Sequence, residues 1–91
     1  MLTWSSYHDP DEAAWYEVDF TDRLGGDEIT GVTVSLPKPA GLAVDDTDFT
    51  GTMARAKLSG GSAGYWARVL FRVQTATGTL DETVRLRIMT G

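Results

Sequence analysis

Apolar and polar residues alternate at every second position in most of the longer segments of this chain, and this period is what most constrains its fold. Val69, Phe71 and Val73 share one face of such a segment, while Arg68 and Arg72 lie on the other. Successive side chains of a β-strand point to opposite sides, so a period of two is that of a half-buried strand. No window of ten or more residues keeps a helical period without a glycine or proline. The sequence therefore predicts an all-β protein.

Glycine, proline and aspartate divide the chain into short segments with this period. The predicted strands are residues 14–20, 29–36, 42–44, 52–58, 65–74 and 84–89. We expect Gly31 to mark a bulge, Pro37 to end the second strand, and residues 23–27 and 45–48 to form turns. Short strands spaced in this way are typical of a sandwich or a barrel. We predict a small antiparallel Ig-like β-sandwich of six to seven strands, with a small barrel as the alternative.

The alternation also predicts which side chains form the core. The expected inward set is Tyr16, Val18, Phe20, Val32, Val34, Leu36, Ala54, Ala56, Leu58, Ala67, Val69, Phe71, Val73, Val84, Leu86 and Ile88. A chain of 91 residues holds one such core. Residues 1–12 show no sustained period and are predicted to be an N-terminal arm or lead-in, followed by a single sandwich domain over residues 13–91. Without cysteine, the core gains neither disulfides nor cysteine-ligated zinc, so packing and assembly must stabilise it.

The charge balance limits the classes of partner. Thirteen acidic residues against eight basic ones give a net charge of -5, which opposes binding to polyphosphate, so no nucleic-acid partner is expected. No stretch approaches the roughly 20 apolar residues of a membrane span, and the N-terminus lacks the basic flank of a signal peptide. We therefore expect no membrane partner.

Residues suited to catalysis or metal binding are sparse. The single histidine, His8, lies in the predicted arm, so no base is expected beside a serine or threonine nucleophile. Residues 8–12 are spread by Pro10, and residues 45–48 lack the glycine pivot and the later bidentate acid of a calcium loop. Residues 60–64 lack the lysine of a phosphate-binding loop and fit a hairpin turn. We predict a protein with no catalytic residues, no bound metal and no cofactor.

Apolar side chains and arginines on faces that alternation assigns to solvent form the candidate site. Trp, Tyr, Met and Arg are enriched at protein interfaces, and exposed apolar patches often mark partners. The predicted interface residues are Trp4, Tyr7, Trp15, Trp66, Leu70, Arg68, Arg72 and Met89. The alternative for each outward tryptophan is that it covers a sheet edge or is covered by the arm.

The arginines suggest what such an interface would bind. Arg68, Arg72, Arg85 and Arg87 are expected to form a basic stripe on the outer face of the last two strands. An acidic partner surface, including the Asp-rich loops of another copy, is one hypothesis for this stripe. Solvated side chains beside outward acids are the other.

Several motifs, taken in order, resemble those of a family of small tailed-phage structural proteins, the fibre-tail or head-tail adaptor-like proteins. The matching motifs are Asp9-Pro10-Asp11, Tyr16-x-Val18-Asp19-Phe20, Leu24-Gly25-Gly26-Asp27-x-Ile29, Gly41-Leu42, Phe49, Leu58-Ser59-Gly60-Gly61-Ser62-Ala63-Gly64 and a closing strand after Thr77-Gly78. The resemblance covers residues 9–90 and departs at Lys57, where the family tends to have an aromatic residue, and at Phe71, where it has a polar one. It implies an Ig-like sandwich in the virion, present in several copies, without enzyme activity.

These observations lead to one principal hypothesis and two alternatives. The principal one is a non-enzymatic phage virion protein, assembled in the host cytoplasm, that acts as an adaptor in the neck, tail or fibre attachment region. Its partners would be other virion proteins and further copies of itself. The first alternative is a capsid decoration protein. The second is a carbohydrate-binding module that stacks sugars on Trp15 and Trp66.

Overall fold

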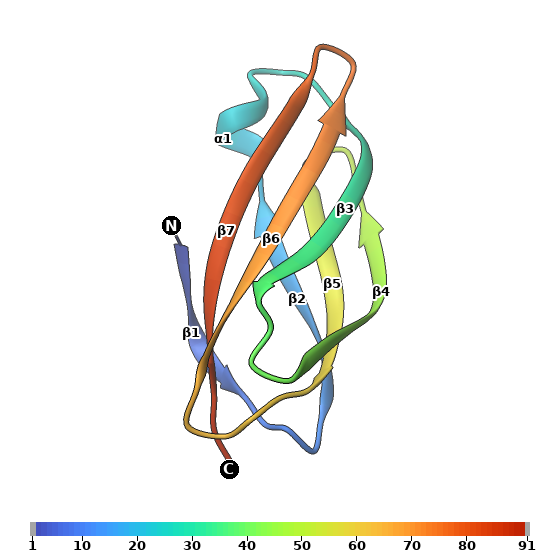
Figure 1. Cartoon of the computed structure of the whole chain (residues 1–91). Coiled ribbons are helices and arrows are strands. Elements are labelled where there is room, and N and C mark those ends of the chain that lie inside the picture. The colour runs from blue at the N-terminus through green and yellow to red at the C-terminus, as the bar shows by residue number, and fades with distance from the viewer. Residues whose placement is uncertain (1, 91) are drawn as a thin grey trace.

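Seven strands form two packed sheets in the part of the chain that the computed structural model describes, residues 2–90 (Figure 1). The elements are β1 (Leu2–His8), β2 (Ala13–Asp19), α1 (Thr21–Leu24), β3 (Ile29–Lys38), β4 (Leu42–Phe49), β5 (Met53–Gly60), β6 (Trp66–Thr75) and β7 (Thr79–Ile88). One sheet has the strand order β1-β7-β6-β3, the other β2-β5-β4. Strands β2 to β7 thus follow the B to G arrangement of an immunoglobulin domain. The prediction of an all-β, Ig-like sandwich is confirmed.

The inner faces of the two sheets meet in one apolar core. Buried apolar side chains at 8% exposure or less come from every strand except β1, and α1 adds Leu24. Every residue predicted to face inward on β5, β6 and β7 is fully buried, and Tyr16, Val32, Val34 and Leu36 pack against this core from partly exposed positions. The alternation therefore predicts the core correctly, including Phe71, which is 0% exposed.

Strand β1 is the element that the sequence pattern does not predict. It pairs in parallel with β7 at one edge of the four-stranded sheet, with Thr3 beside Arg85 and Tyr7 beside Arg87, whereas the other strand pairs are antiparallel. Its register shifts between Thr3 and Tyr7, and this irregularity removes the two-residue period from the sequence. The segment interpreted as an arm is therefore an edge strand followed by a turn. Met1 and Gly91, at the ends of the two predicted segments, lie outside the described residues.

Strand β1 is also fixed to the opposite sheet. The ring of Trp4 lies 4.9 Å from that of Tyr16 and 5.9 Å from that of Phe71, and its Nε1 donates a 3.2 Å hydrogen bond to the carbonyl of Glu17. His8 is 1% exposed, and its Nδ1 shares a 2.8 Å hydrogen bond with the Tyr16 hydroxyl. Burial raises the pKa of Tyr16. His8, which the sequence placed in the predicted arm, is thus held between the sheets by Tyr16.

Two more differences from the prediction fall on edge strands. Strand β3 continues through Pro37 to Lys38, and β4 runs through the four residues 45–48 that were expected to turn. An edge strand leaves one row of backbone groups unpaired, so it tolerates a proline that cannot donate, and charged side chains protect it from pairing with other chains. The predicted bulge is confirmed, since the register of β3 shifts between Ile29 and Gly31.

The predicted turn after β2 contains one helical turn. Helix α1 ends at Leu24 and is capped by Gly25, whose φ of 59° lies in the left-handed region that a glycine adopts without strain. Leu24 enters the core from this turn. The paired glycines therefore mark the end of α1 as well as the reversal of the chain.

Candidate interaction surface

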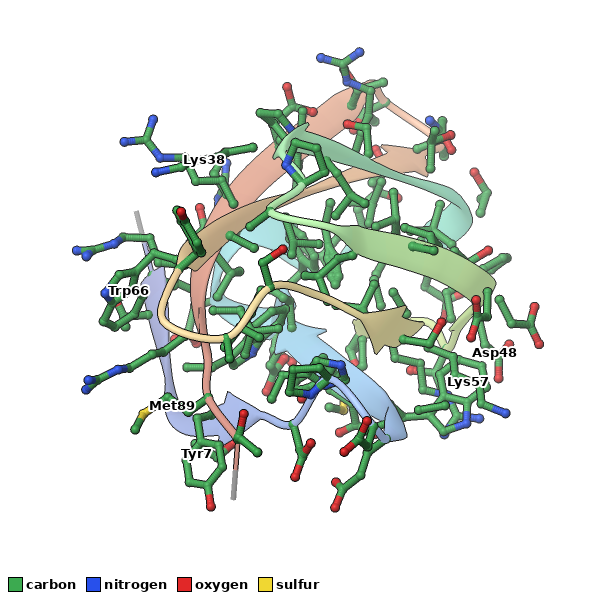
Figure 2. The ribbon with its side chains drawn as sticks, turned by 60° about the horizontal axis from the view of Figure 1, so that its bottom comes forward. Tyr7, Lys38, Asp48, Lys57, Trp66 and Met89 are labelled. Atoms are coloured by element: carbon green, nitrogen blue, oxygen red, sulfur yellow. The ribbon has the colours of Figure 1, made fainter. Side chains whose placement is uncertain are left out.

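The outer face of the four-stranded sheet brings four basic side chains together. Arg68 lies opposite Arg85 of β7 on one side and Lys38 of β3 on the other. Arg87 lies opposite Trp66 and beside Tyr7 of β1. We call this surface the cationic face; it comprises Lys38, Arg68, Arg85 and Arg87 together with Trp66 and Tyr7. Figure 2 shows Lys38, Trp66, Met89 and Tyr7 along the same side of the sandwich.

Trp66 lies at the centre of the cationic face. The guanidinium carbons of Arg85 and Arg87 lie 4.5 Å and 5.9 Å from the centroid of its ring, within the range of cation–π attraction. The indole separates two shallow hollows of about 310 Å³ and about 340 Å³. Lys38 and Arg68 line the first, and Tyr7, Arg87 and Met89 line the second. Trp66 is half-buried and lines both hollows, so its ring forms the ridge between them.

The four cations of this face have no acidic partner in residues 2–90. The three salt bridges of this part of the chain join Arg23 to Glu82, Arg55 to Asp48, and Arg72 to Asp81. Three of the other four basic side chains are thus paired, and the fourth is Lys57 on the other sheet, whereas Lys38, Arg68, Arg85 and Arg87 lie together without a salt bridge in residues 2–90. Arginine is readily desolvated and binds carboxylates in a bidentate way, so this surface is suited to an acidic partner.

Arg72 differs from the rest of the predicted basic stripe. Its Nε and Nη2 donate hydrogen bonds of 2.8 Å to the two carboxylate oxygens of Asp81 on β7. The hydrogen bond from Arg72 holds the pKa of Asp81 below its ordinary value, and Asp81 raises that of Arg72. The stripe is therefore divided into a neutral pair and a charged cluster.

The outer face of the three-stranded sheet has the opposite charge. We call it the acidic face; it carries five exposed carboxylates and two cations. These residues are Glu17, Asp19, Asp45, Asp46, Asp48, Arg55 and Lys57. Figure 2 shows Asp48 and Lys57 on the side of the sandwich opposite Lys38 and Trp66. The two faces therefore point away from each other.

Arg55 organises the centre of the acidic face. Its Nη2 donates a 2.9 Å hydrogen bond to Asp48, and its guanidinium carbon lies 4.6 Å from the centroid of the Trp15 ring. The hydrogen bond from Arg55 lowers the pKa of Asp48. Beside them is a hollow of about 200 Å³ lined by Glu17, Asp48, Phe49, Thr50, Met53 and Arg55. Carboxylate oxygens and apolar walls meet in this hollow.

The structure separates the predicted interface residues into three groups. Tyr7, Trp66, Arg68, Leu70, Arg72 and Met89 lie on or beside the outer face of the four-stranded sheet. Trp15, at 39% exposure, lies on the acidic face. Trp4 points inward and packs against the core, so its main contacts are within the fold.

Sequence reasoning missed Lys38 and the acidic face. Pro37 was expected to end β3, so Lys38 was not placed on the sheet, although a proline on an edge strand is compatible with a further strand residue. The carboxylates of residues 45–48 were assigned to a turn, which hid their alignment with Glu17 across β5. A signal was present, because Asp46 and Asp48 alternate with Thr47.

A metal-ligand cluster and a membrane-spanning helix are both absent from the described residues. Residues 2–90 contain no group of three or more His, Cys, Asp or Glu side chains placed to hold a metal ion. None of the helices described is long and apolar enough to cross a membrane. The candidate sites are the cationic face, with two hollows beside Trp66, and the acidic face, with one beside Arg55.

A two-sheet domain with such faces has the properties of a protein that works by contacting other proteins. Residues 8–87 match the model of the family described as podophage GP4 fiber-tail adaptor protein gp77. The match spans most of the chain, so the protein belongs to this family of phage structural proteins. The resemblance seen in the sequence is thereby confirmed. Among curated proteins, none matches the chain.

Proposed function

We propose that the protein is a non-enzymatic adaptor that is present in several copies in the virion and helps to join fibre proteins to the tail or neck. Its assembly takes place in the host cytoplasm, and its partners are other virion proteins and further copies of itself. The observation that carries this proposal is the cationic face, where four basic side chains lie on one side of the sheet with Trp66 and have no acidic partner in residues 2–90.

Such a surface is better explained by a partner than by solvent alone. Trp, Tyr and Arg are the residue types most often found at the energetic centre of an interface, and the cationic face contains all three. The ridge of Trp66 between two hollows gives a partner a shape to match. A cluster of cations also suits phosphate, but the net charge of -5 repels a nucleic-acid polyanion.

The test is complementation of a phage that lacks this gene. Particles made without the protein should keep capsid and tail but lose fibres in electron micrographs, and their adsorption to cells should fall. The double variant Arg68→Glu/Arg85→Glu should restore neither, whereas Arg72→Gln, which changes a cation already paired with Asp81, should restore both.

The same experiment separates the adaptor from the alternatives. If fibres remain attached in the absence of the protein and capsids break open, the protein is a decoration protein and not an adaptor. Binding of the isolated protein to a glycan array, lost in Trp15→Ala and Trp66→Ala, would replace it by a carbohydrate-binding module. The expected results are intact capsids and no glycan binding.

A further inference from the structure

The two outer faces of the sandwich are complementary in charge. The cationic face carries Lys38, Arg68, Arg85 and Arg87 without a salt bridge in residues 2–90, while the acidic face carries five carboxylates against two cations. Both faces are the broad outer surfaces of sheets and lie on opposite sides of the molecule (Figure 2). The acidic face of a second copy therefore has the charge that would complement the cationic face.

We propose that the partner of the cationic face is the acidic face of a second copy of this chain. The proposal deepens the proposed function and rests on it, since an adaptor present in several copies brings such surfaces together. The contact joins two different surfaces, so each added copy leaves one face of each kind free. Copies joined in this way form a ring if the rotation between them closes, and an open stack if it does not.

The hollow on the acidic face is suited to an arginine side chain. Glu17 and Asp48 line it, and Phe49 and Met53 supply apolar walls. Arg55 lines it too and already pairs with Asp48, so the Glu17 carboxylate, which has no salt bridge in residues 2–90, is the one that can accept from an incoming arginine. An arginine has the matching parts, because its alkyl chain packs against apolar surface while the guanidinium donates to carboxylates. On the cationic face the ridge of Trp66 can lie beside this contact and exclude water from it.

The dimensions of the molecule permit a stable contact. A stable interface buries about 800 Å² on each partner. The sandwich measures 40 × 22 × 19 Å, so one broad side offers an area of that order. The net charge of -5 makes two copies repel each other in most orientations. Only the alignment of cationic face with acidic face turns this repulsion into attraction, which makes the contact specific and sensitive to salt.

Neutralising each face separately tests the proposal in the full chain. The variant Arg68→Gln/Arg85→Gln removes two charges from the cationic face, and Glu17→Gln/Asp46→Asn removes two from the acidic face. In sedimentation velocity at about 0.05 M salt the native protein should form dimers and larger species. These should dissociate at about 0.5 M salt, because the Debye screening length shortens. Each variant alone should sediment as a monomer, with a dissociation constant raised at least about tenfold.

A mixture of the two variants gives the decisive result. Each then retains one intact face, so an equimolar mixture should form 1:1 dimers and nothing larger, which a symmetric contact does not produce. Arg72→Gln is the matched control. It removes a cation from the same sheet face, but Asp81 already neutralises that cation, so this variant should associate like the native protein. Circular dichroism of each variant confirms that it is folded.

Several outcomes would overturn this contact. They are a native protein that stays monomeric at low salt up to its solubility limit, association unchanged by both double variants, and a mixture without dimers. Binding of a fluorescent single-stranded oligonucleotide that Arg68→Gln/Arg85→Gln abolishes would assign the face to nucleic acid instead. If the protein is monomeric but its deletion still removes the fibres, the contact is wrong and the adaptor function is supported. If the protein self-associates but its deletion leaves the fibres attached, the adaptor function is wrong and the contact is supported.

Discussion

Arg68 and Arg85 lie directly opposite each other on β6 and β7, and neither forms a salt bridge within residues 2–90. Like charges at opposed positions destabilise a sheet. Four residues further along β6, Arg72 instead faces Asp81 and makes two hydrogen bonds to it. Strands β6 and β7 thus hold one favourable cross-strand pair, Arg72–Asp81, and one unfavourable pair, Arg68–Arg85. Local rules are most often broken at functional sites, and the unfavourable pair lies in the cationic face beside Trp66.

Removing one member of the Arg68–Arg85 pair should stabilise the isolated protein. We expect Arg68→Thr to raise the free energy of unfolding by roughly 0.2–1 kcal/mol, because it relieves repulsion and places a β-branched residue on a strand. The measurement is urea unfolding at a protein concentration where the chain is monomeric.

Arg72→Thr is the control for this prediction. It makes the same change of residue type on the same strand but breaks the pair with Asp81, so it should not stabilise the protein. Equal shifts of the urea midpoint in the two variants would show that strand propensity, and not repulsion, decides the result.

The central strands could be predicted from the sequence because each of them has one buried face. On β6 and β7 a slip of one residue would expose the whole apolar set, so the period of two is strict and readable. Edge strands are less constrained. Strand β1 loses its period at a register shift and was missed, whereas β3, which accommodates Pro37, and β4, which carries aspartates, were predicted too short. The fourth edge strand, β2, keeps its period and was predicted.

The candidate site could be predicted in part for a related reason. Alternation shows which side chains face outward, and it therefore found Trp66, Arg68 and Arg72. It does not show which residue of a neighbouring strand lies opposite. The pairing of Arg72 with Asp81, and the absence of such a partner for Arg68, depend on the register of β6 with β7. The division of the stripe was thus not accessible from the sequence alone.

Trp4 is expected to act mainly in the fold and Trp15 mainly at the surface. Trp4→Ala removes the ring contacts with Tyr16 and Phe71 and should lower the free energy of unfolding by about 3 kcal/mol. Trp15 lies at 39% exposure over Arg55, so Trp15→Ala should cost less than about 1 kcal/mol. Urea unfolding of both variants checks this order, and a larger loss for Trp15→Ala would contradict the placement of Trp4 between the sheets.

Gly61 is expected to be far less replaceable than its neighbour Gly64. At Gly61 φ is +110°, and an added Cβ would lie 3.0 Å from Cδ1 of Ile88 and 3.2 Å from Cδ2 of Leu42. Gly61→Ala should therefore lower the free energy of unfolding by about 2 kcal/mol or more. Gly64, with φ at +89°, has no described atom within 4 Å of such a Cβ. Gly64→Ala adds only backbone strain, about 1 kcal/mol, and thermal unfolding should show a smaller fall in Tm.

Acid should destabilise the protein through Asp27. Its carboxylate accepts a 2.7 Å hydrogen bond from the Thr77 hydroxyl and a 2.9 Å hydrogen bond from the Glu28 amide, and these lower its pKa from the ordinary value of 3.8. The unfolded chain then binds a proton more readily than the folded one, so the stabilisation is present above about pH 3.8 and is lost as pH falls through the lower folded value. Thr77→Val removes the largest cause of the shift and should reduce the loss of stability between pH 5 and pH 2, whereas Thr77→Ser keeps the hydroxyl and should retain it. The check is the urea midpoint measured across this pH range, and equal acid sensitivity of the valine and serine variants would exclude the Thr77 hydroxyl as the cause.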